Sequence, residues 1–126
     1  MLTTTLRVLF IAHGLVHFFL TAVPIPNDPA SKPGDFFTAT SRSWLLPKLG
    51  LRGPGVHWLG IGLVALTTVG CVTAGLAMLG EAGTNTIWRM VTFVSASLSL
   101  LLLIIFWHAY FLVGMLLDIE ILIGLL

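Results

Sequence analysis

Apolar residues in this chain form long continuous runs, separated by shorter stretches in which polar residues, glycine and proline gather. The first run covers residues 4–23 and the second covers 56–79. As helices, both are long enough to cross about 30 Å of hydrocarbon. The last run extends from Ile87 to Leu126 without a proline, which is too long for one crossing at about 1.5 Å per residue. The last run must therefore turn once.

The segment Trp107-His108-Ala109-Tyr110 is the predicted place of that turn, because aromatic rings concentrate at the membrane interface. This divides the last run into helices over residues 87–106 and 111–126, the latter about one turn short of a full crossing. The pattern predicts an all-α fold: an integral membrane four-helix bundle in one domain, residues 1–126. A single long proline-rich loop, residues 24–55, lies outside the membrane.

Composition agrees with lipid as the solvent. Only 9% of the residues are charged, against about a quarter in soluble domains, and the mean hydropathy is +1.05. The six basic residues form no stripe, which excludes a nucleic-acid binder. Four of them fall in the long loop, so the positive-inside tendency favours a cytoplasmic loop, with both chain ends on the other side. The bilayer is the predicted partner.

Four titratable residues interrupt the first and fourth predicted helices, where charged and polar groups are costly and mark candidate sites. His13 and His17 are four residues apart and share a helical face, whereas Asp118 and Glu120 are two apart and point to different sides. Counted from the loop face, all four lie roughly 9–15 Å deep. One carboxylate is therefore expected to meet the histidines, either as a ligand site or proton relay, or as a polar contact that only fixes helix register.

A second candidate cluster consists of His17, His57 and His108, since His57 begins the second helix and His108 follows the third. These imidazoles could converge near the loop face, where they would suit haem or a metal ion. Ser95, Ser97 and Ser99 are expected to bond to carbonyls of their own helix. Small residues in the second helix, such as Gly70 with Ala74 and Cys71 with Gly75, predict close helix packing.

Several enzyme classes lack their motifs in this sequence: there is no phosphate-binding glycine loop, no H-E-x-x-H and no G-x-S-x-G. The chain resembles small bacterial four-helix membrane proteins of no assigned activity. The resemblance rests on Phe10-Ile11-Ala12-His13-Gly14-Leu15-Val16-His17, on the later Ser43-Trp44-Leu45-Leu46, and on Phe106-Trp107 before Gly114 and Asp118. In size and helix count the chain is also similar to the DoxX-like proteins. The resemblance implies a bacterial inner-membrane location and carries a redox association.

Three function hypotheses remain open at this point, and the sequence decides neither between them nor whether the protein is an enzyme. The first is a membrane subunit or homo-oligomer whose His/carboxylate site binds another membrane subunit, a pigment, a quinone or a lipid. The second is a proton-coupled transporter or channel that uses His13, His17 and Asp118 or Glu120. The third is a haem or metal redox protein built on His17, His57 and His108.

Overall fold

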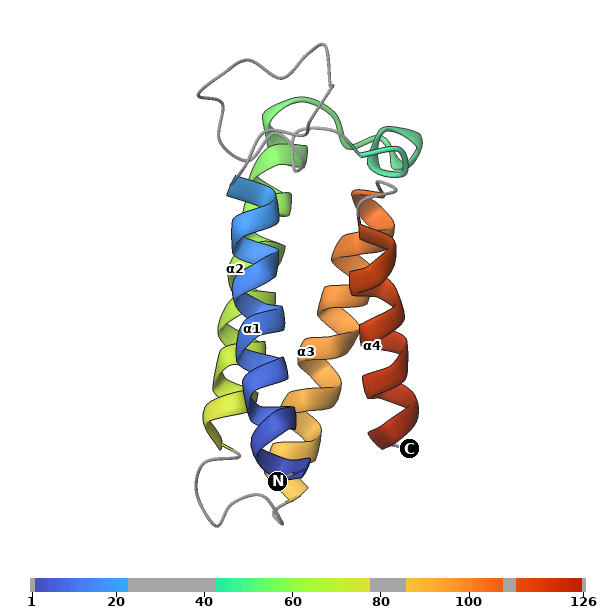
Figure 1. Ribbon diagram of the computed structural model, residues 1–126. Coiled ribbons are helices and arrows are strands. Elements are labelled where there is room, and N and C mark those ends of the chain that lie inside the picture. Colours follow the sequence, from blue (N-terminus) through green and yellow to red (C-terminus); the bar gives the residue numbers. More distant parts are fainter. Residues whose placement is uncertain (1, 23–42, 78–85, 108–110, 126) are drawn as a thin grey trace.

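A computed structural model describes residues 2–22, 43–77, 86–107 and 111–125, and in those ranges the chain is all-α with no strand. Figure 1 shows four α-helices: α1 (Leu2–Ala22), α2 (Pro54–Ala77), α3 (Thr86–Ile105) and α4 (Leu112–Leu125). A 3₁₀ helix, η2 (Leu46–Leu49), precedes α2. The prediction of four helices is confirmed, and each helix end lies within two residues of its expected position.

Consecutive helices run in opposite directions and pack side by side, α1 against α2, α2 against α3 and α3 against α4 (Figure 1). The first turn of α1 and the last turn of α4 lie at one end of the molecule, and η2 lies at the other. The last apolar run is divided as predicted, because α3 ends at Ile105 and α4 begins at Leu112. Residues 108–110 of the predicted turn lie outside the described residues.

The helices expose large apolar side chains along their length. Phe19 is 60% exposed on α1, Val69 is 64% exposed on α2 and Val113 is 68% exposed on α4. By length and composition, α2 and α3 could each cross a membrane. In α1, a shorter apolar helical stretch covers Val8–Phe19. The helix α4 has 14 residues and is the short one, as predicted.

Small residues bring α2 close to both of its neighbours. A methyl group added at Gly70 would lie 2.3 Å from Ser95 Oγ on α3. One added at Gly14 of α1 would lie 2.9 Å from Cys71 Cβ and 3.1 Å from the carbonyl oxygen of Thr68. Neither position has room for a larger residue, so the predicted close packing of α2 is confirmed.

The segment before α2 closes the end of α3. Ser43 donates a hydrogen bond of 2.6 Å to the carbonyl oxygen of Ile105, and the Trp44 indole donates one of 2.7 Å to that of Ile104. These bonds satisfy carbonyls that the end of a helix leaves without an intrahelical donor. The Trp44 ring is 51% exposed with the Lys48 ammonium 5.1 Å from its centroid.

Candidate functional site

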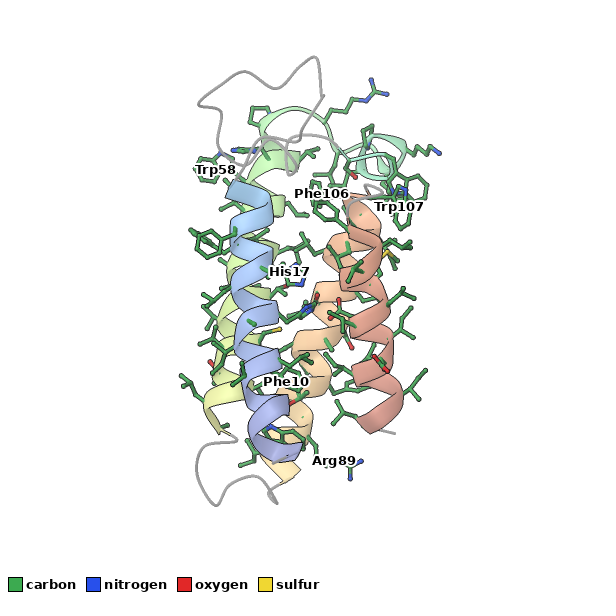
Figure 2. The ribbon with its side chains drawn as sticks, viewed as in Figure 1. Phe10, His17, Trp58, Arg89, Phe106 and Trp107 are labelled. Atoms are coloured by element: carbon green, nitrogen blue, oxygen red, sulfur yellow. The ribbon has the colours of Figure 1, made fainter. Side chains whose placement is uncertain are left out.

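Two buried histidines of α1 face the interior of the helix group. His13 and His17 are 5% and 3% exposed, and one helical turn separates them. Their rings meet edge to face with centroids 4.6 Å apart, and their Nε2 atoms are 3.2 Å apart. Figure 2 shows His17 directed from α1 toward α3 and α4. The prediction that both imidazoles share one face is confirmed.

Asp118 of α4 meets this pair. It is 0% exposed, and its Oδ1 atom lies 2.9 Å from His13 Nε2, although the two residues are far apart in the sequence. Depth counting from the loop face placed a carboxylate of α4 level with His13, and the structure brings Asp118 to that place. The juxtaposition follows because α1 and α4 run in opposite directions between the same two ends (Figure 1).

Ser99 of α3 completes the group, which we call the polar centre: His13, His17, Ser99 and Asp118. Its Oγ atom lies 2.6 Å from His17 Nε2, and its hydroxyl donates to Asp118 Oδ2. The expectation that this serine bonds to its own helix is wrong, because its hydroxyl turns to Asp118 and His17 instead. For Ser95 the expectation is confirmed, since its hydroxyl donates to the Val91 carbonyl oxygen at 2.7 Å.

A signal in the sequence could have identified Ser99. Thr92, Ser95 and Ser99 recur with helical spacing, so they line a single face of α3, and all three are buried. A polar stripe inside an otherwise apolar helix indicates the face that meets other polar groups.

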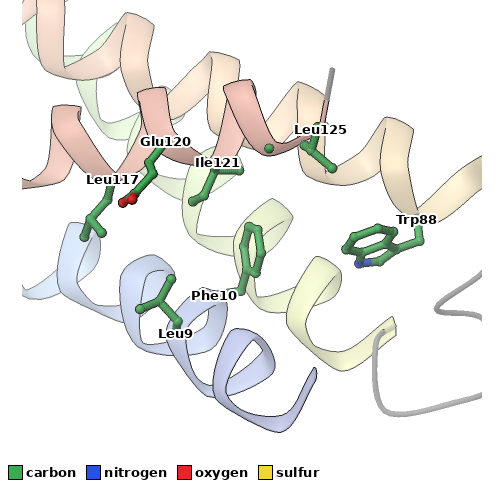
Figure 3. A pocket seen from close by; sticks show the side chains of 8 residues that line it. Leu9, Phe10, Trp88, Leu117, Glu120, Ile121 and Leu125 are labelled. Atoms are coloured by element: carbon green, nitrogen blue, oxygen red, sulfur yellow. The ribbon is translucent and has the colours of Figure 1, made fainter. Parts of the chain in front are cut away.

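Glu120 does not join the polar centre. It is exposed and lines a separate cavity of about 330 Å³ near the end of α4, together with Phe10 and Trp88 (Figure 3). The helical period explains the difference, because Glu120 lies two positions after Asp118 and its side chain therefore points to another side of α4. Of the two acids predicted as candidates, only Asp118 meets the histidines.

The predicted cluster of His17, His57 and His108 lies only partly within the residues that the structure describes. His57 lies in the first turn of α2, half-buried, with its ring edge to face against Trp58 at 6.1 Å between centroids. His108 lies outside the described residues. Within the described ranges, the histidine and acidic side chains that converge closely enough for one metal ion are His13, His17 and Asp118. Haem binding by the loop-face histidines stays a prediction.

An apolar cavity of about 270 Å³ adjoins the polar centre. His13 and His17 form part of its wall, and the rest comes from apolar residues of α1, α3 and α4, among them Ala12, Leu103 and Phe111. The cavity lies where α1 and α4 face each other. A volume near the lower end of small-molecule sites suits one ring or a short chain segment, and is small for a macrocycle.

Comparison with known proteins adds no relative from which a function could be transferred. No family model, no curated protein and no solved structure matches the chain. The resemblance to DoxX-like and other small bacterial membrane proteins therefore stays a prediction. Any functional conclusion has to rest on the polar centre and the cavity beside it.

Proposed function

We propose that this chain is a membrane protein whose four helices cross the bilayer as a bundle, with the polar centre inside the hydrocarbon region. The exposed surfaces of all four helices are rich in large apolar side chains, and α2 and α3 have the length and composition of membrane spans. Ionisable residues inside a membrane face the protein interior and pair with one another, as His13 and Asp118 do. By its resemblance, the chain belongs in a bacterial inner membrane. Its small size favours assembly as a homo-oligomer or with other membrane subunits.

Membrane integration is tested by washing membranes that contain the full chain with alkaline carbonate. The protein is expected to stay with the membrane pellet and to leave it only in detergent, because its exposed side chains are solvated by lipid. Release into the alkaline supernatant would contradict the membrane proposal.

Within this membrane protein, the polar centre and its cavity form a binding site for a lipid-soluble molecule of the quinone class. The observation that carries this proposal is the apolar cavity between α1 and α4 with two imidazoles in its wall. A ligand dissolved in the bilayer could reach it from the side, with its ring against Leu103 and Phe111. Carbonyl oxygens of a quinone accept hydrogen bonds of the kind that imidazole donates.

A short-chain photoreactive quinone analogue tests this site. We expect it to label α1 and α4, and we expect Ala12→Phe to weaken binding about tenfold, or about 1.4 kcal/mol, by filling the cavity without touching the polar centre. The matched control is Ala65→Phe, which adds the same ring at an exposed position of α2 that does not line the cavity. Equal labelling of both variants would show that the quinone binds elsewhere.

A second candidate function is proton transfer coupled to transport. The contacts that join His17, His13, Asp118 and Ser99 in one continuous group favour it, because proton relays in membranes are built from such chains. If this is the function, liposomes containing the protein should show a flux driven by a pH gradient. His13→Ala should abolish that flux, and Glu120→Gln should preserve it.

A further inference from the structure

The four side chains of the polar centre make more short contacts than two-centre hydrogen bonds can account for. Four short contacts form a closed ring: His13 with His17, His17 with Ser99, Ser99 with Asp118, and Asp118 with His13. A two-centre hydrogen bond places one hydrogen atom between one donor and one acceptor. Each imidazole Nε2 atom takes part in two of these contacts, but it carries either one hydrogen or one lone pair.

No placement of hydrogens gives each of the four contacts a two-centre hydrogen bond. For the 3.2 Å contact, one of the two Nε2 atoms must donate to the other, so its hydrogen is no longer free for its second contact. If His13 donates to His17, the 2.9 Å contact with Asp118 has no hydrogen from the imidazole. If His17 donates to His13, the His17 hydrogen is used there, and the imidazole has no hydrogen left for the 2.6 Å contact with Ser99. The single lone pair of His13 Nε2 is then used as well, so His13 has neither a hydrogen nor a lone pair for Asp118. A cation among the lone pairs would satisfy these atoms together.

Two of the three separations between the ligand atoms are near those of a metal site. In a tetrahedral zinc site with metal–nitrogen bonds of about 2.0–2.1 Å, neighbouring ligand atoms are about 3.3 Å apart. The two Nε2 atoms are 3.2 Å apart, and Asp118 Oδ1 lies 2.9 Å from His13 Nε2. All three ligand atoms lie within 4.8 Å of one another. The carboxylate also offsets part of the charge of a divalent ion away from water.

We propose that His13 Nε2, His17 Nε2 and the Asp118 carboxylate bind a divalent transition-metal ion of the zinc or ferrous type. Two imidazoles and one carboxylate are the ligand set that suits these ions and leaves a coordination position open. Ser99 acts as a positioning residue, because its hydroxyl donates to Asp118 Oδ2 and orients the carboxylate. The inference deepens the proposed function, since the ion would occupy the same polar centre that the cavity reaches.

Cobalt(II) alone is the probe, because its visible absorption reports imidazole and carboxylate coordination. The full chain is purified in detergent, stripped with a chelator and titrated with Co²⁺. We expect one ion per chain, displaced by Zn²⁺ according to the usual order of metal affinities. His13→Ala and Asp118→Asn should weaken binding about 100-fold or more, and Ser99→Ala about 10-fold to 100-fold. The matched controls His57→Ala and Glu120→Gln should bind Co²⁺ like the parent.

A measurement on the unaltered protein covers variants that fail to fold. Zn²⁺ should protect His13 and His17, but not His57, from an imidazole-modifying reagent. A folded parent chain that binds no Co²⁺, or binds it equally well after His13→Ala, would overturn the metal site. Labelling of metal-free protein by the quinone analogue tests the proposed function separately. If the analogue labels a protein that binds no Co²⁺, only the metal inference fails. If the protein binds Co²⁺ but is not labelled, only the quinone proposal fails.

Discussion

Replacing Asp118 by alanine is expected to lower the free energy of unfolding by about 3–5 kcal/mol, because it leaves two buried polar groups, the His13 imidazole and the Ser99 hydroxyl, without their partner. Asp118 is 0% exposed and contacts both the His13 imidazole and the Ser99 hydroxyl. Water cannot replace the lost carboxylate in a site that apolar residues enclose. The effect is measured as the unfolding free energy in mixed detergent micelles, followed by circular dichroism.

Glu120→Ala is the matched control for this substitution. It removes an acid from the same helix two residues further on, where the side chain is exposed and lies outside the polar centre. Little change in stability is expected, as for most exposed positions. A comparable loss of stability at both positions would mean that any acid-to-alanine change in α4 destabilises the protein, and that the contact of Asp118 with His13 contributes nothing specific.

The helices were predictable because their apolar runs are long, continuous and separated by polar stretches. A span must be continuous, apolar and about 20 residues long, so the runs of the sequence already define α1, α2 and α3 within two residues at each end. Even the break between α3 and α4, inside one apolar run, follows from length and from the aromatic residues near Trp107. The contacts of Ser43 and Trp44 with α3 were not predictable, since they depend on how a loop folds back.

Part of the polar centre was predictable for a related reason. Helices that cross the same slab in opposite directions can be compared by depth, which brought His13 level with the acids of α4. Which acid turns inward depends on the rotation of α4 about its axis, and only packing sets that rotation. Ser99 was missed because a hydroxyl can bond to its own helix at little cost, and only the helical spacing of Thr92, Ser95 and Ser99 indicates that this face meets other polar groups.

Replacing His13 and Asp118 together by leucine is expected to be far less destabilising than the sum of the two single substitutions. Each single change leaves a buried polar group without its partner, whereas the double change removes both and adds apolar volume. Residues in direct contact show coupling energies of up to about 3 kcal/mol, and this pair should lie near that limit. The unfolding free energies of the parent, both single variants and the double variant give the coupling directly.

The same four proteins separate a structural contact from a functional site. A contact that only fixes helix register would be replaced by packed leucines without loss, and the double variant would bind the quinone analogue and Co²⁺ as the parent does. If the polar centre is a binding site, the double variant recovers stability and still fails to bind either. Additive losses in stability would instead mean that His13 and Asp118 contribute independently, which their 2.9 Å contact argues against. His13 and Asp118, which stability does not require, would then be present in this chain because they bind a ligand.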